Sequence, residues 1–146
     1  MRLCRLVYKS TTSWDLLNNQ VLAKLAETSA RNNAAEKITG LLILSDETFL
    51  QVLEGPDEAV NALYGKIVKN PLHHDVRLLS FQQIASRNFH DWSMRFVDLN
   101  DVPKSPRELF RKKYEDTEGY IHVPDDALCA IALLFDAQAL CRAEGT

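Results

Sequence analysis

The chain has 146 residues, of which 46% are hydrophobic and 25% are charged, the balance of a globular protein with one domain. Its 17 lysines and arginines against 20 aspartates and glutamates give a net charge of −3, whereas a generic nucleic-acid binder is usually basic. The longest uncharged apolar stretch, Ala127 to Phe135, is far shorter than the roughly 20 residues of a membrane span. Residues 1–8 show no signal-peptide pattern, so the expected location is the cytoplasm.

The residue types that carry chemistry form no enzyme motif. Neither a phosphate-binding glycine loop nor a serine-hydrolase or zinc-protease pattern is present. The three cysteines are widely spaced, which argues against a disulfide framework or zinc site and favours buried or half-buried thiols. His73 and His74, followed by Asp75, are compatible with a loop metal site or a phosphate contact, but a solvated turn is the favoured interpretation. We therefore expect neither a metal site nor an enzyme.

The first half of the chain alternates between strand and helix patterns. Residues 3–8 alternate with apolar side chains on both faces, which indicates a central strand. An amphipathic pattern predicts a helix from about Trp14 to Arg31 that ends at Asn32-Asn33. Residues 38–44 and 48–54, separated by a tight turn, predict two strands of a hairpin.

The second half begins with a helix over residues 57–69, which opens after Pro56 and closes with lysines. Two strands follow, near residues 76–84 and 94–99. From Pro103 onward the pattern is helical, with one helix opening near Ser105 and another running from Ala127 to about Arg142. The last helix carries enough apolar surface to require a partner, either the second face of the sheet or another protomer.

This order of elements predicts an α/β fold, a ferredoxin-like βαββαββ sandwich with a mixed five-stranded sheet, two helices on one face, and C-terminal helices. Crossover connections are expected to place the first and third strands side by side and parallel. Tyr8 and Gln51 then lie on neighbouring strands. A glutamine facing the helices needs hydrogen-bond partners, so Gln51 is expected to take part in a polar network.

Several separated motifs resemble the BLUF family of flavin-based blue-light sensors. The resemblance covers residue 3 to about residue 100 and rests on Arg5-Leu6-Val7-Tyr8, Arg31-Asn32-Asn33, Ile38-Thr39-Gly40-Leu41-Leu42, Phe49-Leu50-Gln51-Val52-Leu53-Glu54-Gly55, His73-His74 and Trp92-Ser93-Met94-Arg95. It implies a BLUF photosensory domain over residues 1–100. Residues 101–146 are then a C-terminal helical extension that packs on the domain or forms an oligomer interface.

The resemblance implies that FAD binds without a covalent bond, its ring between the two helices. The residues that it places around the cofactor are Tyr8, Leu25, Ser29, Arg31, Asn32, Asn33, Gln51, Lys66, Ile67 and His74. Asn32 and Asn33 would hold the pyrimidine edge, because an amide both donates and accepts. Taken alone, these asparagines are more typical of a helix C-cap, and Lys66 is typical of dipole compensation at a helix end.

The same resemblance gives Tyr8 and Gln51 the photochemistry, with electron and proton transfer from Tyr8 and a rearranged hydrogen-bond network at Gln51. Trp92 and Met94 are the implied output residues, and which of them faces the flavin stays open. Without the resemblance, Tyr8 is an ordinary strand tyrosine, Gln51 a structural amide and Trp92 a core residue.

The expected function is thus a blue-light photoreceptor that acts through protein contacts. A downstream signalling protein of unknown identity and a homo-oligomer are the expected partners, with no direct nucleic-acid or membrane binding. Two alternatives remain, a flavin-dependent redox enzyme that uses the same pocket and a ligand-free ferredoxin-like interaction module.

Overall fold

A five-stranded sheet organises the chain in the computed structural model, which describes residues 2–114 and 119–144. Its strands are β1 (Leu3–Thr11), β2 (Thr39–Ser45), β3 (Thr48–Pro56), β4 (His74–Gln83) and β5 (Arg95–Asp98). They lie in the order β4-β1-β3-β2-β5. The central position of β1 and the five-stranded sheet of the sandwich are as predicted from the element order.

The first and third strands are neighbours, but they run antiparallel, so the expectation of a parallel pair was wrong. In this topology the crossover through α1 makes β2 run in the same direction as β1, and one strand position is left between β1 and β2. The hairpin partner β3 fills that position and runs the opposite way. Because β2 and β5 pair in parallel, the sheet is mixed, as expected.

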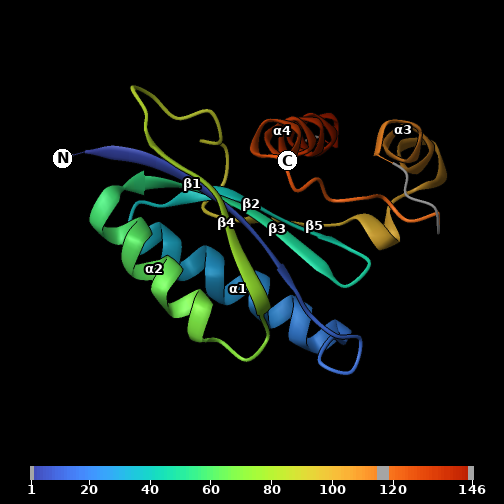
Figure 1. Cartoon of the computed structure of the whole chain (residues 1–146), viewed down its shortest axis with the longest axis horizontal. Coiled ribbons are helices and arrows are strands. Elements are labelled where there is room, and N and C mark those ends of the chain that lie inside the picture. The colour runs from blue at the N-terminus through green and yellow to red at the C-terminus, as the bar shows by residue number, and fades with distance from the viewer. Residues whose placement is uncertain (1, 115–118, 145–146) are drawn as a thin grey trace.

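Helices cover both faces of the sheet (Figure 1). The helices α1 (Asn19–Ala35) and α2 (Asp57–Lys69) lie on one face, and α4 (Ala127–Ala143) lies on the other with α3 (Lys104–Tyr114) beside it. A short 3-10 turn, η1 (Leu99–Asp101), follows β5. None of the helices in the described residues is long and apolar enough to cross a membrane.

Successive side chains of the central strands point to opposite faces of the sheet, so the protein has two separate hydrophobic cores. Leu6 and Tyr8 pack toward α1 and α2, whereas Val7 between them packs toward α4. Leu133 and Leu134 of α4 are fully buried in that second core. Of the two partners expected for the last helix, the structure therefore supplies the second face of the sheet.

The first helix is shifted relative to its prediction. It begins at Asn19 rather than Trp14, because the side chain of Asn18 caps it by accepting the backbone N–H of Val21 at 2.9 Å. It continues past Asn32 and Asn33 to Ala35, and the chain leaves it through Lys37, whose φ is 61°. Both asparagines thus lie within the last turn and do not cap the helix. The cysteine expectation was wrong at one position, since Cys129 is exposed.

A buried carboxylate fixes the segment between β4 and β5. Glu54, fully buried at the end of β3, accepts the backbone N–H groups of Asn88 and Phe89 at 2.9 and 2.7 Å, and Arg5 Nη1 lies 3.4 Å from its other oxygen. Gln138 of α4 donates to the carbonyl of Asn88 at 2.8 Å. Glu54 thereby joins β3 to the segment that leads to β5 and, through it, to α4.

We expect Glu54→Gln to lower the free energy of unfolding by about 1–3 kcal/mol, because an amide nitrogen would face donors where a carboxylate oxygen now accepts. Urea unfolding followed by circular dichroism measures the change. Glu58→Gln, an exposed acid on α2, is the matched control and should change stability by about 0.5 kcal/mol or less. Equal effects of the two substitutions would contradict the structural role of Glu54.

Candidate functional site

A cavity of about 190 Å³ lies between α1, α2 and the sheet. Its walls comprise Tyr8, Leu25, Thr28, Ser29, Asn32, Asn33, Leu42, Gln51, Leu63, Lys66, Ile67, Asn70 and His73. Its lining combines apolar side chains from the two helices with polar side chains from the sheet and from both helices. The cavity therefore suits a flat, largely apolar ligand with polar edge atoms.

The floor of the cavity is a hydrogen bond between neighbouring strands. Tyr8 and Gln51 are directly paired residues of β1 and β3, and the Tyr8 hydroxyl donates to Oε1 of Gln51. Burial raises the pKa of the Tyr8 phenol, and the nearby Tyr64 raises it further. Tyr8 is accordingly a neutral hydrogen-bond donor in the resting protein.

Gln51 also contacts Met94, since its Nε2 donates to Met94 Sδ at 3.3 Å. Met94 is buried in the core under α1 and α2, whereas Trp92 packs against the core under α4, with the Arg95 guanidinium 5.6 Å from its ring centre. Both residues precede β5 instead of lying within it. Tyr8, Gln51 and Met94 thus form one continuous buried chain, from which Trp92 points away.

Asn33 brings an unused donor to the cavity. Its side chain is 3% exposed, and Nδ2 has no hydrogen-bond partner among the described residues. Such a buried orphan is costly unless another group accepts from it. The cavity therefore offers a donor for an acceptor atom on a bound molecule.

Eight of the ten residues expected around the cofactor line this cavity, and two do not. Arg31 is exposed and lies 3.9 Å from Glu27 on the same helix, and His74 is exposed at the start of β4. Sequence reasoning also missed several lining residues, namely Thr28, Leu42, Leu63, Asn70 and His73. The resemblance placed His74 at the cofactor, but adjacent residues of an extended segment point in opposite directions, and His73 turns toward the cavity instead.

His73 is the inward histidine. Its Nδ1 lies 2.8 Å from Ser10 Oγ, and its ring packs against Tyr8 and Phe49 at centroid distances of 6.0 and 5.2 Å. Burial, and to a smaller extent the neighbouring His74, lowers the pKa of His73 to about 4. The described residues contain no cluster of three potential metal ligands.

Acid should destabilise the fold through His73. Between the unfolded pKa of 6.5 and the folded pKa of about 4, only the unfolded chain binds the proton, so stability falls as the pH drops through this window. At a pH below about 4, the free energy of unfolding is lower by roughly 3 kcal/mol because of His73. Denaturant unfolding at a series of pH values tests this, and His73→Gln should flatten the dependence. An unchanged slope in that variant would show that other groups cause it.

Comparison with known proteins identifies the family to which the chain is similar. The family model described as BLUF, sensors of blue-light using FAD, matches residues 3–95. The photoactivated adenylate cyclase subunit beta of Euglena longa is 31% identical over 103 residues, which are 70% of this chain and 12% of the relative. The blue light- and temperature-regulated antirepressor BluF of Escherichia coli is 30% identical over 78 residues, 53% of this chain and 19% of that protein.

Solved structures agree with the sequence comparison. A structure of BlsA in its photo-activated state superposes with a TM-score of 0.66 at 29% identity, covering 79% of this chain and 81% of that chain. The BLUF protein BlrB in its dark state gives a TM-score of 0.63 at 28% identity, over 81% of this chain and 91% of that chain.

The sandwich and its cavity define a flavin-based sensor of blue light. The chain belongs to the BLUF family, whose members use FAD to sense blue light. It spans about a tenth of the length of the cyclase subunits that it matches. Those relatives couple a photoreceptor to an enzyme, and nothing shows that the chain itself is an enzyme.

Proposed function

We propose that the cavity between α1 and α2 holds the ring of FAD and that the chain of Tyr8, Gln51 and Met94 converts light into altered protein contacts. The observation that carries the proposal is this buried hydrogen-bonded chain at the floor of the cavity. A cavity of about 190 Å³ is smaller than the roughly 300–1,000 Å³ of sites that enclose whole drug-sized ligands. It fits a planar ring whose attached chain extends outside.

The residues that line the cavity fit FAD. Leu25 and Ile67 supply the apolar walls for the ring faces, and Asn33 supplies the unused donor for a ring carbonyl. Asn32 and Ser29 stand beside it on α1. Lys66, on α2, supplies positive charge for the phosphates. Arg31 and His74 lie outside the cavity, so any contact they make is with the part of FAD outside it.

Bound flavin supplies an excited state, reached with blue light, that oxidises a phenol. Tyr8 then gives up an electron together with its hydroxyl proton, for which Oε1 of Gln51 is the acceptor already in place. Tyr8 would regain both when the resting state returns. Gln51 has one donor end and one acceptor end, so rotation or tautomerisation leaves it with a different set of partners.

A rearrangement of Gln51 changes its contact with Met94, because the Met94 sulfur accepts a hydrogen bond from Gln51 in the resting structure. Only Ser93 separates it from Trp92, which packs under α4. We propose that the output passes along this segment to the C-terminal helices, residues 101–146 being the extension to the photosensory domain of residues 1–100. We propose a downstream signalling protein as the regulated partner, and the cytoplasmic location remains a prediction.

The absorption spectrum tests the proposal most directly. The purified chain loaded with FAD should show a flavin spectrum that shifts slightly to the red under blue light and returns in the dark. A bound flavin that oxidises NAD(P)H stoichiometrically would instead support the redox enzyme. A chain that stays colourless after refolding with FAD would support the ligand-free module.

A further inference from the structure

The outer face of α4 is apolar although the sheet already buries its inner face. Within Ala127–Ala143 only Asp136, Gln138 and Arg142 are charged or carry an amide. Leu128 is 79% exposed and Phe135 is 38% exposed, and Ala139 between Phe135 and Arg142 is also exposed. A helix that is apolar on all sides is normally covered on all sides.

The residues of this face have the spacing of a helix-pairing seam. The seam, defined here as Leu128, Ala132, Phe135, Ala139 and Arg142, advances by steps of four and three residues. That alternation is the pattern of positions that meet a second helix in a coiled coil. Figure 1 shows α4 on the side of the sheet opposite α1 and α2. On the outer face Phe135 stacks on Phe89 with ring centres 4.9 Å apart, and Phe135 is still 38% exposed.

We propose that a second copy of this chain covers the seam, with the two α4 helices antiparallel about a two-fold axis near Leu133 and Leu134. In that register Leu128 of one copy lies opposite Ala139 of the second, and Phe135 lies opposite Ala132. Each layer pairs one large and one small side chain, which fills the space between the helices evenly. A parallel pair would instead stack large on large and alanine on alanine.

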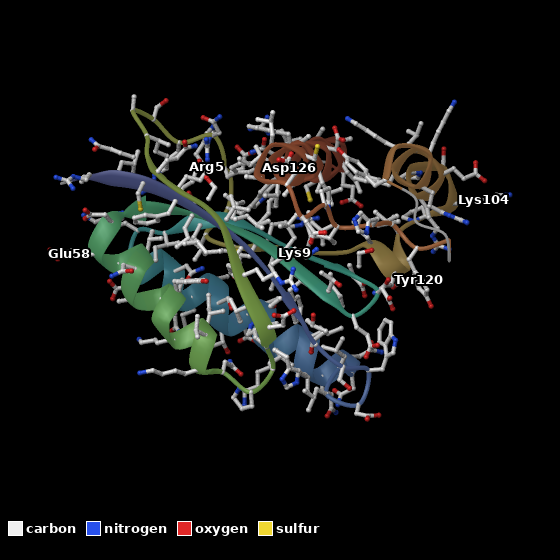
Figure 2. The ribbon with its side chains drawn as sticks, in the orientation of Figure 1. Arg5, Lys9, Glu58, Lys104, Tyr120 and Asp126 are labelled. Carbon is white, nitrogen blue, oxygen red and sulfur yellow. The ribbon has the colours of Figure 1, made fainter. Side chains whose placement is uncertain are left out.

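Charge supports the same register independently. The alignment that matches large to small side chains places Arg142 opposite Asp125 of the second copy. Asp125 precedes the capping residue Asp126, which is labelled in Figure 2. Arg142 also binds Asp91 at 2.6 Å, and Asp125 binds Lys9 at 2.7 Å, so the contact extends two existing ion pairs. A parallel pair would bring the acidic ends of the two helices together.

The neighbouring surface accepts the protruding leucine. A groove of about 510 Å³ separates α3 from α4, and its walls include Leu109, Phe110, Ala139 and Leu140. Leu109 is 70% exposed on its rim. Leu128 of the second copy, lying over Ala139, reaches this rim, and the two-fold axis repeats the contact. Such a self-complementary pair of patches is the basis of a closed dimer.

The oligomeric state of the flavin-loaded chain tests the proposal. Sedimentation velocity should show a concentration-dependent dimer, and Leu128→Glu and Ala139→Glu should each raise its dissociation constant at least tenfold. Leu78→Glu is the matched control, since Leu78 is 50% exposed on the edge strand β4 and does not belong to α4. An acid at position 128 lies in the first turn of α4, where it does not impair folding.

Cross-linking tests the orientation. In a Cys129→Ser background, a mixture of Leu128→Cys and Ala139→Cys chains should form a covalent dimer that neither variant forms alone. A monomer at all concentrations, a dimer insensitive to Leu128→Glu, or cross-linking of Leu128→Cys with itself would overturn the proposal. So would a monomer that binds lipid vesicles through the seam. The flavin spectrum of each variant, recorded in parallel, separates failure of this interface from failure of the light sensor.

Discussion

Tyr8→Phe and Gln51→Ala should each retain bound flavin and lose the light-induced red shift. The first substitution removes the hydroxyl that donates to Gln51 and the proton that leaves with the electron, and phenylalanine is much harder to oxidise. The second removes the amide whose two ends contact Tyr8 and Met94. Neither removes an apolar wall of the cavity or the donor of Asn33. Difference spectra before and after blue illumination measure the effect.

Matched controls separate this role from a general perturbation. Tyr64→Phe removes a hydroxyl from a ring 5.7 Å from that of Tyr8, and Gln138→Ala removes a buried amide on the other side of the sheet. Both should keep the reversible shift, although Gln138→Ala is expected to be less stable. A normal light-induced shift in Tyr8→Phe or Gln51→Ala would refute the roles given to these two residues.

Gly40→Ala should be the most damaging small substitution, lowering the free energy of unfolding by about 3 kcal/mol or more. A Cβ at this position would lie 1.9 Å from the carbonyl oxygen of Val52 on the paired strand, and the φ of 157° adds to the strain. Because the obstacle is backbone, a side-chain movement cannot relieve it. The added atom would also touch Met94 at 3.4 Å, so any folded fraction should have an altered photoproduct.

Gly65→Ala is the control for this prediction. Gly65 lies within α2 and an added Cβ would meet nothing within 4 Å, so the substitution should stabilise the protein by about 0.5–1 kcal/mol through helix propensity. Thermal and urea unfolding of the two variants measure both effects. A Gly40→Ala chain as stable as the parent would show that β2 and β3 are not in the close contact described.

The sequence predicted best those features that follow from the order of strands and helices along the chain. The order of elements was enough to predict that Tyr8 and Gln51 lie on neighbouring strands, and they are directly paired. The strand direction was mispredicted because the hairpin, not the crossover, supplies the neighbour of β1. The start of α1 was mispredicted because the cap at Asn18 prevails over apolar residues that occur earlier.

By itself the sequence determined the order of elements, the family, and eight of the residues that line the cavity, because periodicity and motif spacing are local properties of the chain. Only the tertiary structure decided that Met94 and not Trp92 contacts Gln51, since that depends on how Glu54 and β2 hold the segment before β5. It also decided that His73 turns inward while His74 stays exposed. Those choices depend on which packing buries the most apolar surface without leaving polar groups unpaired, a property of the assembled fold.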